Sequence, residues 1–379
     1  MSNHESGGQD RIFVWDLPTR LFHWLLVLSY AGAWLTFDDN RYLYAHVFAG
    51  YTFFGLLSFR LLWGMVGSHY ARFRAFAYDW PSVWAYLRAL FTGNAARHVG
   101  HNPAGSWVIF LIIGLGFVVS IAGLITLGGE EQHGPFKGLL AFAAGTNIKE
   151  IHETAAWLLL TLTALHVAGV ITESFVHREN LVMAMISGYK FGNQAEAVNK
   201  PYAIIAVVML LIVAGSGFVY FKGYLNAAPD RPYVPFQGPT LPDNATWRQE
   251  CSDCHLAYHP TLLPARSWRK LMADQADHFG EDLALDQETI QEITAFLVSN
   301  AAESRLSEPA WKISSTTPQD QTPLRITDTP YWKKKHDDIP DGIWKLPKVR
   351  DKGNCGACHL DAEQGTFEDS GMRLPKVRE

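Results

Sequence analysis

Two histidines lie in one long apolar stretch, residues 151–175, at a spacing that suits metal binding. His152 and His166 are 14 residues apart, close to four turns of an α-helix, so both rings should leave one face of the helix. A rise of about 1.5 Å per residue separates them by roughly 21 Å along the axis. Because a hydrocarbon core is about 30 Å thick, one ring should lie near each membrane surface. Ionisable side chains in spans are costly and usually functional.

Two further histidines could complete two metal sites. His23 begins the first apolar run and His46 begins the second. If the N-terminus is cytoplasmic, His23 shares the inner depth with His166, and His46 shares the outer depth with His152. Each pair could bind one b-type haem from opposite faces, because neutral imidazole is a common ligand of haem iron. The alternative is that these histidines only hydrogen-bond to neighbouring helices.

All four cysteines fall in two CxxCH units. The units are Cys251, Cys254 and His255, and then Cys355, Cys358 and His359. CxxCH is the attachment signature of c-type haem, in which the thiols bind the vinyl groups and the histidine binds iron. A zinc half-site would explain one unit but not two. Since no cysteine is left over, no disulfide is expected.

Each c-type iron also needs a sixth ligand or an open site. His278 and His336 are free to swing across the two haems, and we favour them. Met272 is the alternative for the first haem, because Met/His ligation also occurs in c-type cytochromes. His259 follows His255 by four residues and so shares its helical face. We therefore expect His259 to be a surface residue.

The distribution of apolar residues predicts an all-α fold, with an integral-membrane helical bundle followed by a small helical domain. Five apolar runs stand out: residues 21–37, 43–62, 106–127, 154–175 and 202–221. We expect four haem-binding helices and a fifth transmembrane helix. Six glycines would let either a macrocycle or another helix approach closely: Gly32, Gly50, Gly55, Gly114, Gly116 and Gly123.

The expected division of the chain has three parts. They are a membrane domain at 1–200, the fifth helix with an extended linker at 201–246, and a c-type domain at 247–379. Lys and Arg set the orientation, with ten in the segments 1–20, 60–105 and 177–200 against three in the intervening ones. This bias predicts a cytoplasmic N-terminus and a periplasmic C-terminal domain. Residues 81–91 could be an interfacial helix or an amphipathic loop, and no cleavable signal peptide is apparent.

A polar cluster is expected beside the inner histidine pair. Arg20, His101 and Asn102 fall at the inner ends of the first and third runs. A quinone needs hydrogen-bond donors on its carbonyls and a proton route, and these side chains offer both. The alternative is that His101 and Asn102 only cap the third helix. We expect the other histidines of this half to be solvated: His69, His98, His133 and His177.

The membrane half resembles a known family. The motifs are VWDLPTRLFHW, HVFAGYTFFGLLSFRLLWGMVGS, GHNPAGSW and LHVAGVITESFVHRENLVMAMISGYK. Over about residues 11–192 they resemble the bacterial cytochrome b561 and nickel–iron hydrogenase b-type cytochromes. The resemblance implies two b haems, the four histidine ligands already given, and electron exchange with the quinone pool. Hydrogenase subunits are expected to end after this domain, whereas this chain continues.

The C-terminal part resembles the soluble dihaem cytochrome c family over about residues 247–379. The likeness rests on ECSDCHLAYHPTLLPARSW, DHFGED, ITDTPYWKKKH and NCGACHLDAEQGTF, and it implies that His278 and His336 are distal ligands. Residues 267–279 and 287–299 are expected to be helices, with Asp286 as a cap on the second. So small a domain should need its haems to complete the core.

These features predict a multi-pass protein of the bacterial cytoplasmic membrane that carries electrons between quinone and a periplasmic redox protein, another cytochrome in the leading interpretation. The cofactors would be two non-covalent haem b and two covalent haem c, and quinol:cytochrome c oxidoreductase activity is a possibility. One alternative is a periplasmic small-molecule oxidase or reductase with an open c haem. Another is a membrane anchor for a larger redox enzyme. Nothing points to a nucleic-acid partner.

Overall fold

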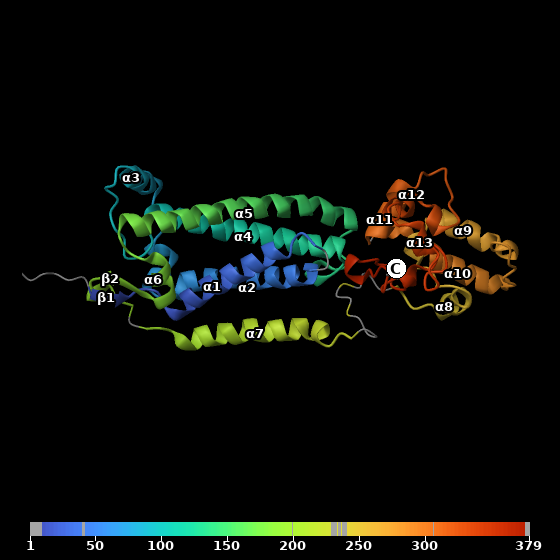
Figure 1. The fold of residues 1–379 in the computed structure, drawn as a ribbon, viewed down its shortest axis with the longest axis horizontal. Helices are drawn as coiled ribbons and strands as arrows, with labels where there is room; N and C mark the ends of the chain where they lie inside the picture. Colours follow the sequence, from blue (N-terminus) through green and yellow to red (C-terminus); the bar gives the residue numbers. More distant parts are fainter. Residues whose placement is uncertain are drawn as a thin grey trace, which may run out of the picture. The chain divides into compact units, whose positions relative to one another are not determined.

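The structure, a computed structural model, describes residues 10–39, 42–198, 200–228, 233, 236, 241–305 and 307–375. The chain forms two compact units. One comprises Met1–Ile121 and Ile151–Lys222, and the other comprises Ala122–Glu150 and Gly223–Glu379. Helices dominate both units (Figure 1), which confirms the all-α class. Most of the predicted linker between 227 and 243 lies outside the described residues.

Five long helices cover the five apolar runs. They are α1 (Leu17–Leu35), α2 (Leu43–Val66), α4 (Pro103–Glu130), α5 (Phe142–Val176) and α7 (Ala203–Leu225). In the described residues, α2, α4, α5 and α7 are long and apolar enough to cross a membrane. Helix α1 is not among these four, although its 19 residues extend for about 28 Å. It packs along α2.

A single carboxylate fixes the start of α1. The Asp16 carboxylate accepts a hydrogen bond from the Thr19 backbone N–H at 2.7 Å, which caps the helix. Its second oxygen accepts from Trp63 Nε1 near the end of α2 at 3.2 Å. One turn into α1, Phe22 packs against Leu56 of α2. The position of α1 along the axis of α2 is therefore fixed by two contacts, one at the start of α1 and one about a turn further on.

A short sheet that the sequence did not predict closes one end of this unit. Strand β1 (Asp10–Phe13) pairs antiparallel with β2 (Tyr189–Gly192), and Asp10 lies opposite Gly192. Helix α6 (Leu181–Ser187) leads into β2 through Gly188, whose φ of +90° suits glycine. Figure 1 shows α3, α6 and this sheet at the same end of the long helices.

Residues 81–91 were expected to form either an interfacial helix or an amphipathic loop. They are helical, within α3 (Trp80–Phe91), so the loop is excluded. The Asp79 side chain caps it by accepting from the Ser82 backbone N–H at 3.2 Å. Trp80, Trp84 and Phe91 are all exposed, as an interfacial helix would need. A position at the membrane surface remains a proposal.

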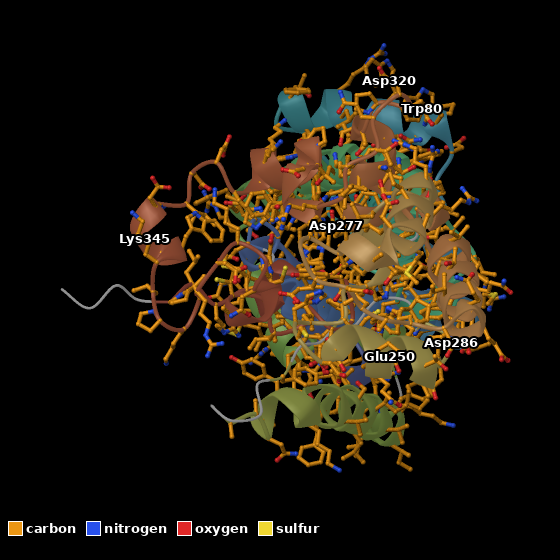
Figure 2. All side chains as sticks on the ribbon, turned by 90° about the vertical axis from the view of Figure 1, so that its right-hand side faces the viewer. Trp80, Glu250, Asp277, Asp286, Asp320 and Lys345 are labelled. Carbon is orange, nitrogen blue, oxygen red and sulfur yellow. The ribbon has the colours of Figure 1, made fainter. Side chains whose placement is uncertain are left out.

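The second unit is built from short helices. They are α8 (Ala245–Ser252), α9 (Ala265–Ala273), α10 (Gln287–Ser299), α11 (Glu308–Thr316), α12 (Pro330–Lys335) and α13 (Asp341–Trp344). Helix α10 has the predicted bounds, and the predicted cap Asp286 (labelled in Figure 2) accepts from the Thr289 backbone N–H at 2.9 Å. The helix predicted for 267–279 is wrong in its second half, because α9 ends at Ala273.

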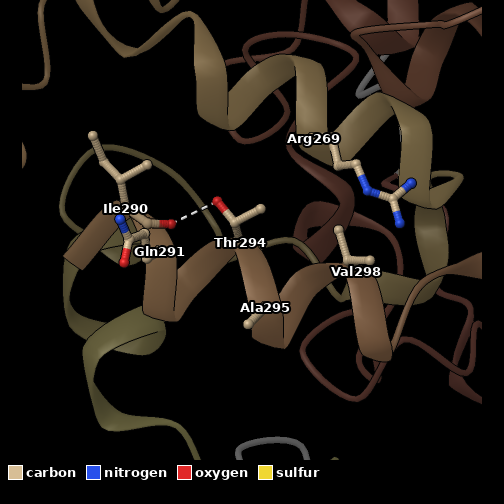
Figure 3. A pocket seen from close by; sticks show the side chains of 6 residues that line it. All are labelled: Arg269, Ile290, Gln291, Thr294, Ala295 and Val298. Atoms are coloured by element: carbon tan, nitrogen blue, oxygen red, sulfur yellow. Dashed lines mark hydrogen bonds between the residues drawn. The ribbon is translucent and has the colours of Figure 1, made fainter. Parts of the chain in front are cut away.

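The main core of the second unit lies between α8, α9 and α10. Its buried members are Trp247, Leu263, Trp268, Met272, Ile293, Phe296, Leu297 and Ala301. On the outer side of α9 and α10, Figure 3 shows a shallow groove of about 320 Å³. Its lining is Arg269, Ile290, Gln291, Thr294, Ala295 and Val298. The groove offers no histidine or cysteine and is therefore not a haem site.

The connection between α4 and α5 also belongs to the second unit. The Phe142 backbone N–H donates to the Arg305 carbonyl at 3.1 Å. The Phe142 ring lies 5.4 Å from the Trp311 ring of α11. A segment that links two membrane helices in sequence thus packs with the residues that follow the fifth helix.

Replacing Ile293 tests the core of the second unit. Ile293 is fully buried on α10, so Ile293→Ala should destabilise the unit by about 2–5 kcal/mol through lost burial and a cavity. Ile293→Val should cost about 0.5–1.5 kcal/mol. The thermal midpoint of the c-type Soret circular dichroism, measured on the full chain in detergent, checks this order. Gln291→Ala, at an exposed position of the groove on the same helix, is the control, and an equal loss there would contradict the core assignment.

Candidate functional site

The outer histidine pair predicted from the sequence is assembled in the structure. His46 of α2 and His152 of α5 face one another with ring centroids 6.1 Å apart. Two imidazoles that bind one metal from opposite sides would have ring centres roughly 6.4 Å apart, from a metal–nitrogen bond of about 2 Å and about 1.2 Å from nitrogen to ring centre. The gap therefore fits one iron between the rings.

Hydrogen bonds orient both of these rings. His46 Nδ1 donates to the Ala33 carbonyl of α1, and His152 Nδ1 donates to the Val119 carbonyl of α4, each at 2.9 Å. A carbonyl can only accept, so Nδ1 carries the proton and Nε2 is left as a ligand. Four helices thus position one pair.

Space for a macrocycle exists beside this pair. Gly50 lies one turn after His46 on the same face of α2, and a Cβ added there would meet no atom within 4 Å. Gly116 is different, since a Cβ there would lie 2.7 Å from the Leu57 side chain. Helix packing therefore explains Gly116, whereas the space beside Gly50 is open, as it is beside Gly55 and Gly114.

The inner histidines show no ring-to-ring contact like that of the outer pair. His166 of α5 is among the groups that surround His23 of α1. His23 Nδ1 is buried and has no hydrogen-bond partner in the described structure. His101 belongs to the same end of the helices, because its ring packs on Trp15, which directly precedes the cap of α1.

The first CxxCH histidine has a partner at the same separation. The His255 and His278 rings lie 6.3 Å apart with an interplanar angle of 28°. His255 Nδ1 donates to the Leu256 carbonyl at 2.7 Å, which leaves Nε2 available. Met272 is 6% exposed in the core, and its sulfur lies 3.5 Å from Gln275 Nε2. The geometry favours His278 over Met272.

The second CxxCH histidine repeats this arrangement. The His336 and His359 rings lie 6.3 Å apart. His336 Nδ1 donates to the Trp332 carbonyl at 2.8 Å, and the His336 ring stacks on the Trp332 ring at 4.4 Å. Burial lowers the pKa of His278, His336 and His359, and this favours the neutral imidazole that binds metals.

The four cysteines are free thiols. Cys251 lies in the last turn of α8, and Cys355 begins a short 3₁₀ turn. Because none is consumed in a disulfide, all four remain available for thioether bonds to haem. Each unit therefore has two thiols, a proximal histidine and a facing histidine, a donor set that fits a c-type haem.

The expectation of a surface position for His259 is wrong. The side chain is 3% exposed. Its Nδ1 lies 2.7 Å from the Thr261 hydroxyl and accepts from the Thr261 backbone N–H at 3.4 Å. The ring acts as a cap on the short turn Pro260–Leu262, and this role explains its burial.

Two of the four loop histidines are not solvated as expected. His69 and His133 are exposed, but His177 and His98 are not. His177 Nε2 lies 3.3 Å from the Glu173 carboxylate, which also accepts from the Tyr86 hydroxyl. His98 Nδ1 lies 3.4 Å from the Tyr78 hydroxyl.

The three residues of the expected quinone site have defined contacts. Asn102 Oδ1 accepts from the Gly105 backbone N–H at 2.6 Å, so it caps α4. Arg20 Nη1 donates to the Ile186 carbonyl at 2.6 Å. The His101 ring is packed against Trp15 and Phe76, at 4.9 and 4.2 Å between centroids. Burial, with smaller effects of neighbouring cations, lowers the pKa of His101 to about 3.

Comparison with known proteins places the two halves in different families. Residues 14–188 match the family described as Prokaryotic cytochrome b561. A probable Ni/Fe-hydrogenase B-type cytochrome subunit of Cupriavidus necator is 26% identical over 214 residues, which is 47% of this chain and 86% of that protein. A probable Ni/Fe-hydrogenase 1 B-type cytochrome subunit of Escherichia coli K12 is 24% identical over 222 residues, with 50% and 94% covered.

Residues 247–367 match the family described as Dihaem cytochrome c. The diheme cytochrome c from Rhodobacter sphaeroides is 43% identical, with 34% of this chain and 100% of that chain covered and a TM-score of 0.31. The diheme cytochrome type c from Shewanella baltica is 34% identical, with 36% and 95% covered and a TM-score of 0.29. Residues 14–188 thus match the prokaryotic cytochrome b561 family and residues 247–367 match the dihaem cytochrome c family, and the two matches together support electron transfer with haem b and haem c.

Proposed function

We propose that this protein carries electrons between the membrane quinone pool and a periplasmic redox protein through two b haems and two c haems. The observation that carries the proposal is the recurrence of one geometry, with facing histidine rings at 6.1, 6.3 and 6.3 Å in three separate places. Haem iron held by two nitrogen ligands supplies one-electron chemistry without binding a substrate.

The proposed axial ligands form four pairs. His46 with His152 and His23 with His166 hold the b haems, and His255 with His278 and His336 with His359 hold the c haems. Cys251, Cys254, Cys355 and Cys358 form the thioether bonds. Every proposed b-haem ligand lies on α1, α2 or α5, while α4 contributes the Val119 carbonyl.

An electron conduit is favoured over a small-molecule oxidase or reductase. Such an enzyme needs an open iron position, whereas a histidine faces the proximal ligand in both c-type units. The hydrogenase subunits among the relatives support a different alternative, a membrane anchor for another enzyme. The present chain carries its own c-type region after the membrane helices, so it has an internal route for electrons that such an anchor would not need.

We place the protein in the bacterial cytoplasmic membrane with its c-type region in the periplasm. The excess of Lys and Arg in segments 1–20, 60–105 and 177–200 supports this orientation. The membrane-surface position of α3 follows from it, because α3 falls within 60–105. Covalent attachment of haem at the outer face agrees with the same topology.

The quinone site is proposed at the cytoplasmic end, beside His23 and His166. Two hydrogen-bonded groups of protonatable side chains lie at this end. The Tyr86 hydroxyl donates to Glu173, and the Tyr78 hydroxyl lies 3.4 Å from His98 Nδ1. Protonatable groups in sequence are what proton release from a quinol requires.

Double substitutions test the pairing of the b-haem ligands. His46→Ala with His152→Ala should remove one b haem, because both belong to one site. His23→Ala with His152→Ala should remove both, because each site loses a ligand. Pyridine haemochrome counting of b against c haem in the purified protein gives the numbers. Loss of a single b haem from the second double variant would show that the pairing is wrong.

The sixth ligand of the first c haem is tested by spectroscopy. His278→Ala should convert this haem to a high-spin form that binds carbon monoxide, because its distal ligand is gone. Met272→Ala should leave it low-spin, since the sulfur sits in the core. Electron paramagnetic resonance and carbon monoxide difference spectra report the outcome. The reverse pattern would assign Met272 as the ligand.

Quinol oxidation in vesicles tests the proposed function and its direction. Purified protein should reduce an external c-type acceptor with quinol as donor. With the outside positive, an electron that crosses outward gains up to about 2.3 kcal/mol per 100 mV, so the potential should quicken transfer. An uncoupler provides the control. Absence of turnover would favour the membrane-anchor alternative, and slowing by the potential would move the quinone site to the outer haem.

A further inference from the structure

Arg60 is a buried cation without a matching anion. It lies on α2, within an apolar helix, and is 4% exposed. Its Nη1 atom is buried and has no hydrogen-bond partner in the described structure. A guanidinium stays protonated in proteins and has only donors. An arginine inside a membrane span usually marks a functional site, because its burial is costly without an anion or acceptor.

The nearest carboxylate is already engaged. Asp16 interacts with Arg60 electrostatically, but its oxygens accept from the Thr19 backbone N–H and from Trp63 Nε1. Among the described residues, no carboxylate lies within ion-pair distance of Arg60. The negative charge of Asp16 therefore lowers the free-energy cost of burying Arg60, but the Asp16 oxygens form no hydrogen bond with the N–H groups of the guanidinium.

Aromatic rings cover the guanidinium. Its central carbon lies 4.6 Å from the centre of the Phe73 ring and 5.7 Å from that of Phe76. Such faces attract a cation, but they do not replace the in-plane acceptors that the N–H groups need. His101 packs on Phe76 at 4.2 Å and interacts electrostatically with Arg60.

Arg60 lies at the level of the inner histidine pair. The centroids of the Phe22 ring on α1 and the Phe59 ring on α2 lie 6.2 Å apart, and the carboxylate of Asp16, the cap of α1, accepts a hydrogen bond from Trp63 Nε1. Residue 60 of α2 therefore stands between the levels of residues 16 and 22 on α1, within one turn of the level of His23. The His101 ring, which packs on the Phe76 ring near Arg60, belongs to the same end of the helices.

We propose that Arg60 binds a carboxylate of the porphyrin held by His23 and His166, an inference that rests on the proposed function. The porphyrin of haem b carries two carboxylates, and the planar fork of arginine binds a carboxylate through two parallel hydrogen bonds. A phospholipid phosphate is the other anion that a membrane supplies. The almost complete burial of Arg60 favours the porphyrin, which would be bound inside the bundle. The charge of Arg60 should also favour the reduced form of the inner haem.

Redox titration of the purified, haem-loaded full chain tests the proposal. Arg60→Gln should lower the reduced-to-oxidised ratio of the inner b haem about tenfold at a fixed potential, as expected for losing a charge about 10 Å from iron at an effective dielectric constant of about 20. A tenfold change equals 59 mV for one electron. The outer b haem should not change. Arg72→Gln is the matched control, because Arg72 Nε already donates to the Gly67 carbonyl at 2.7 Å.

A second variant keeps the test decisive if Arg60→Gln does not fold. Arg60→Lys keeps the charge but loses the fork, so the inner-haem ratio should change less than about threefold while the propionate bending bands in resonance Raman spectra shift. An unchanged potential in Arg60→Gln, or unchanged bands in Arg60→Lys, would overturn the proposal. So would loss of co-purified anionic phospholipid in Arg60→Gln without a shift in potential. A wild-type protein with one b haem would instead contradict the proposed function.

Discussion

The proposed outer haem site depends on two hydrogen bonds from histidine rings to helix carbonyls. In a bilayer the backbone groups of each helix are satisfied internally, so a carbonyl with a remaining lone pair is the acceptor that a helix can offer a neighbouring ring. Ala33 and Val119 provide such acceptors for His46 and His152. Both rings are thereby held in one tautomer, with Nε2 directed away from the acceptor and toward the partner ring. Shifting either helix by one residue would rotate its carbonyl by about 100° and remove the bond.

The same dependence on helix register operates at the other end of the membrane unit. Asp16 joins the start of α1 to Trp63 of α2, and the β1–β2 pair joins the chain before α1 to the chain after α6. These contacts lie at one end of the helices, and they fix the position of His23 along the axes of the helices that carry Arg60 and His166. Two ligands that come from different helices require such contacts, because a shift of one helix along its axis by one turn displaces its histidine ring by about 5.4 Å.

The sequence predicts the features that have a period or a motif. The apolar runs predicted the five long helices, and the CxxCH units predicted the dihaem cytochrome c region. The 14-residue spacing predicted two levels of ligands on one helix, which stays a prediction. It does not reveal pairings between distant segments. The strands β1 and β2 have four residues each, too few to show a strand pattern, and 175 residues lie between them. His98 and His177 looked like loop histidines because Tyr78 and Glu173, their partners, are identified only by the fold. Arg60 looked like one more positive-inside charge.

The two kinds of haem site differ in what holds the ligands in place, and this difference affects folding. In the membrane unit, long helices carry all four proposed ligands, and helix carbonyls orient the rings of His46 and His152. In the c-type unit, the proximal histidines follow the attachment cysteines directly, while His278 lies outside any helix and His336 follows a helix of six residues. Stacking on Trp332 orients His336, but His278 has no hydrogen bond to its Nδ1 in the described structure. The His278 backbone is nevertheless held, because its N–H donates to the Glu281 carbonyl at 2.7 Å. The rotation of the His278 ring is therefore what a bound haem would fix at this site.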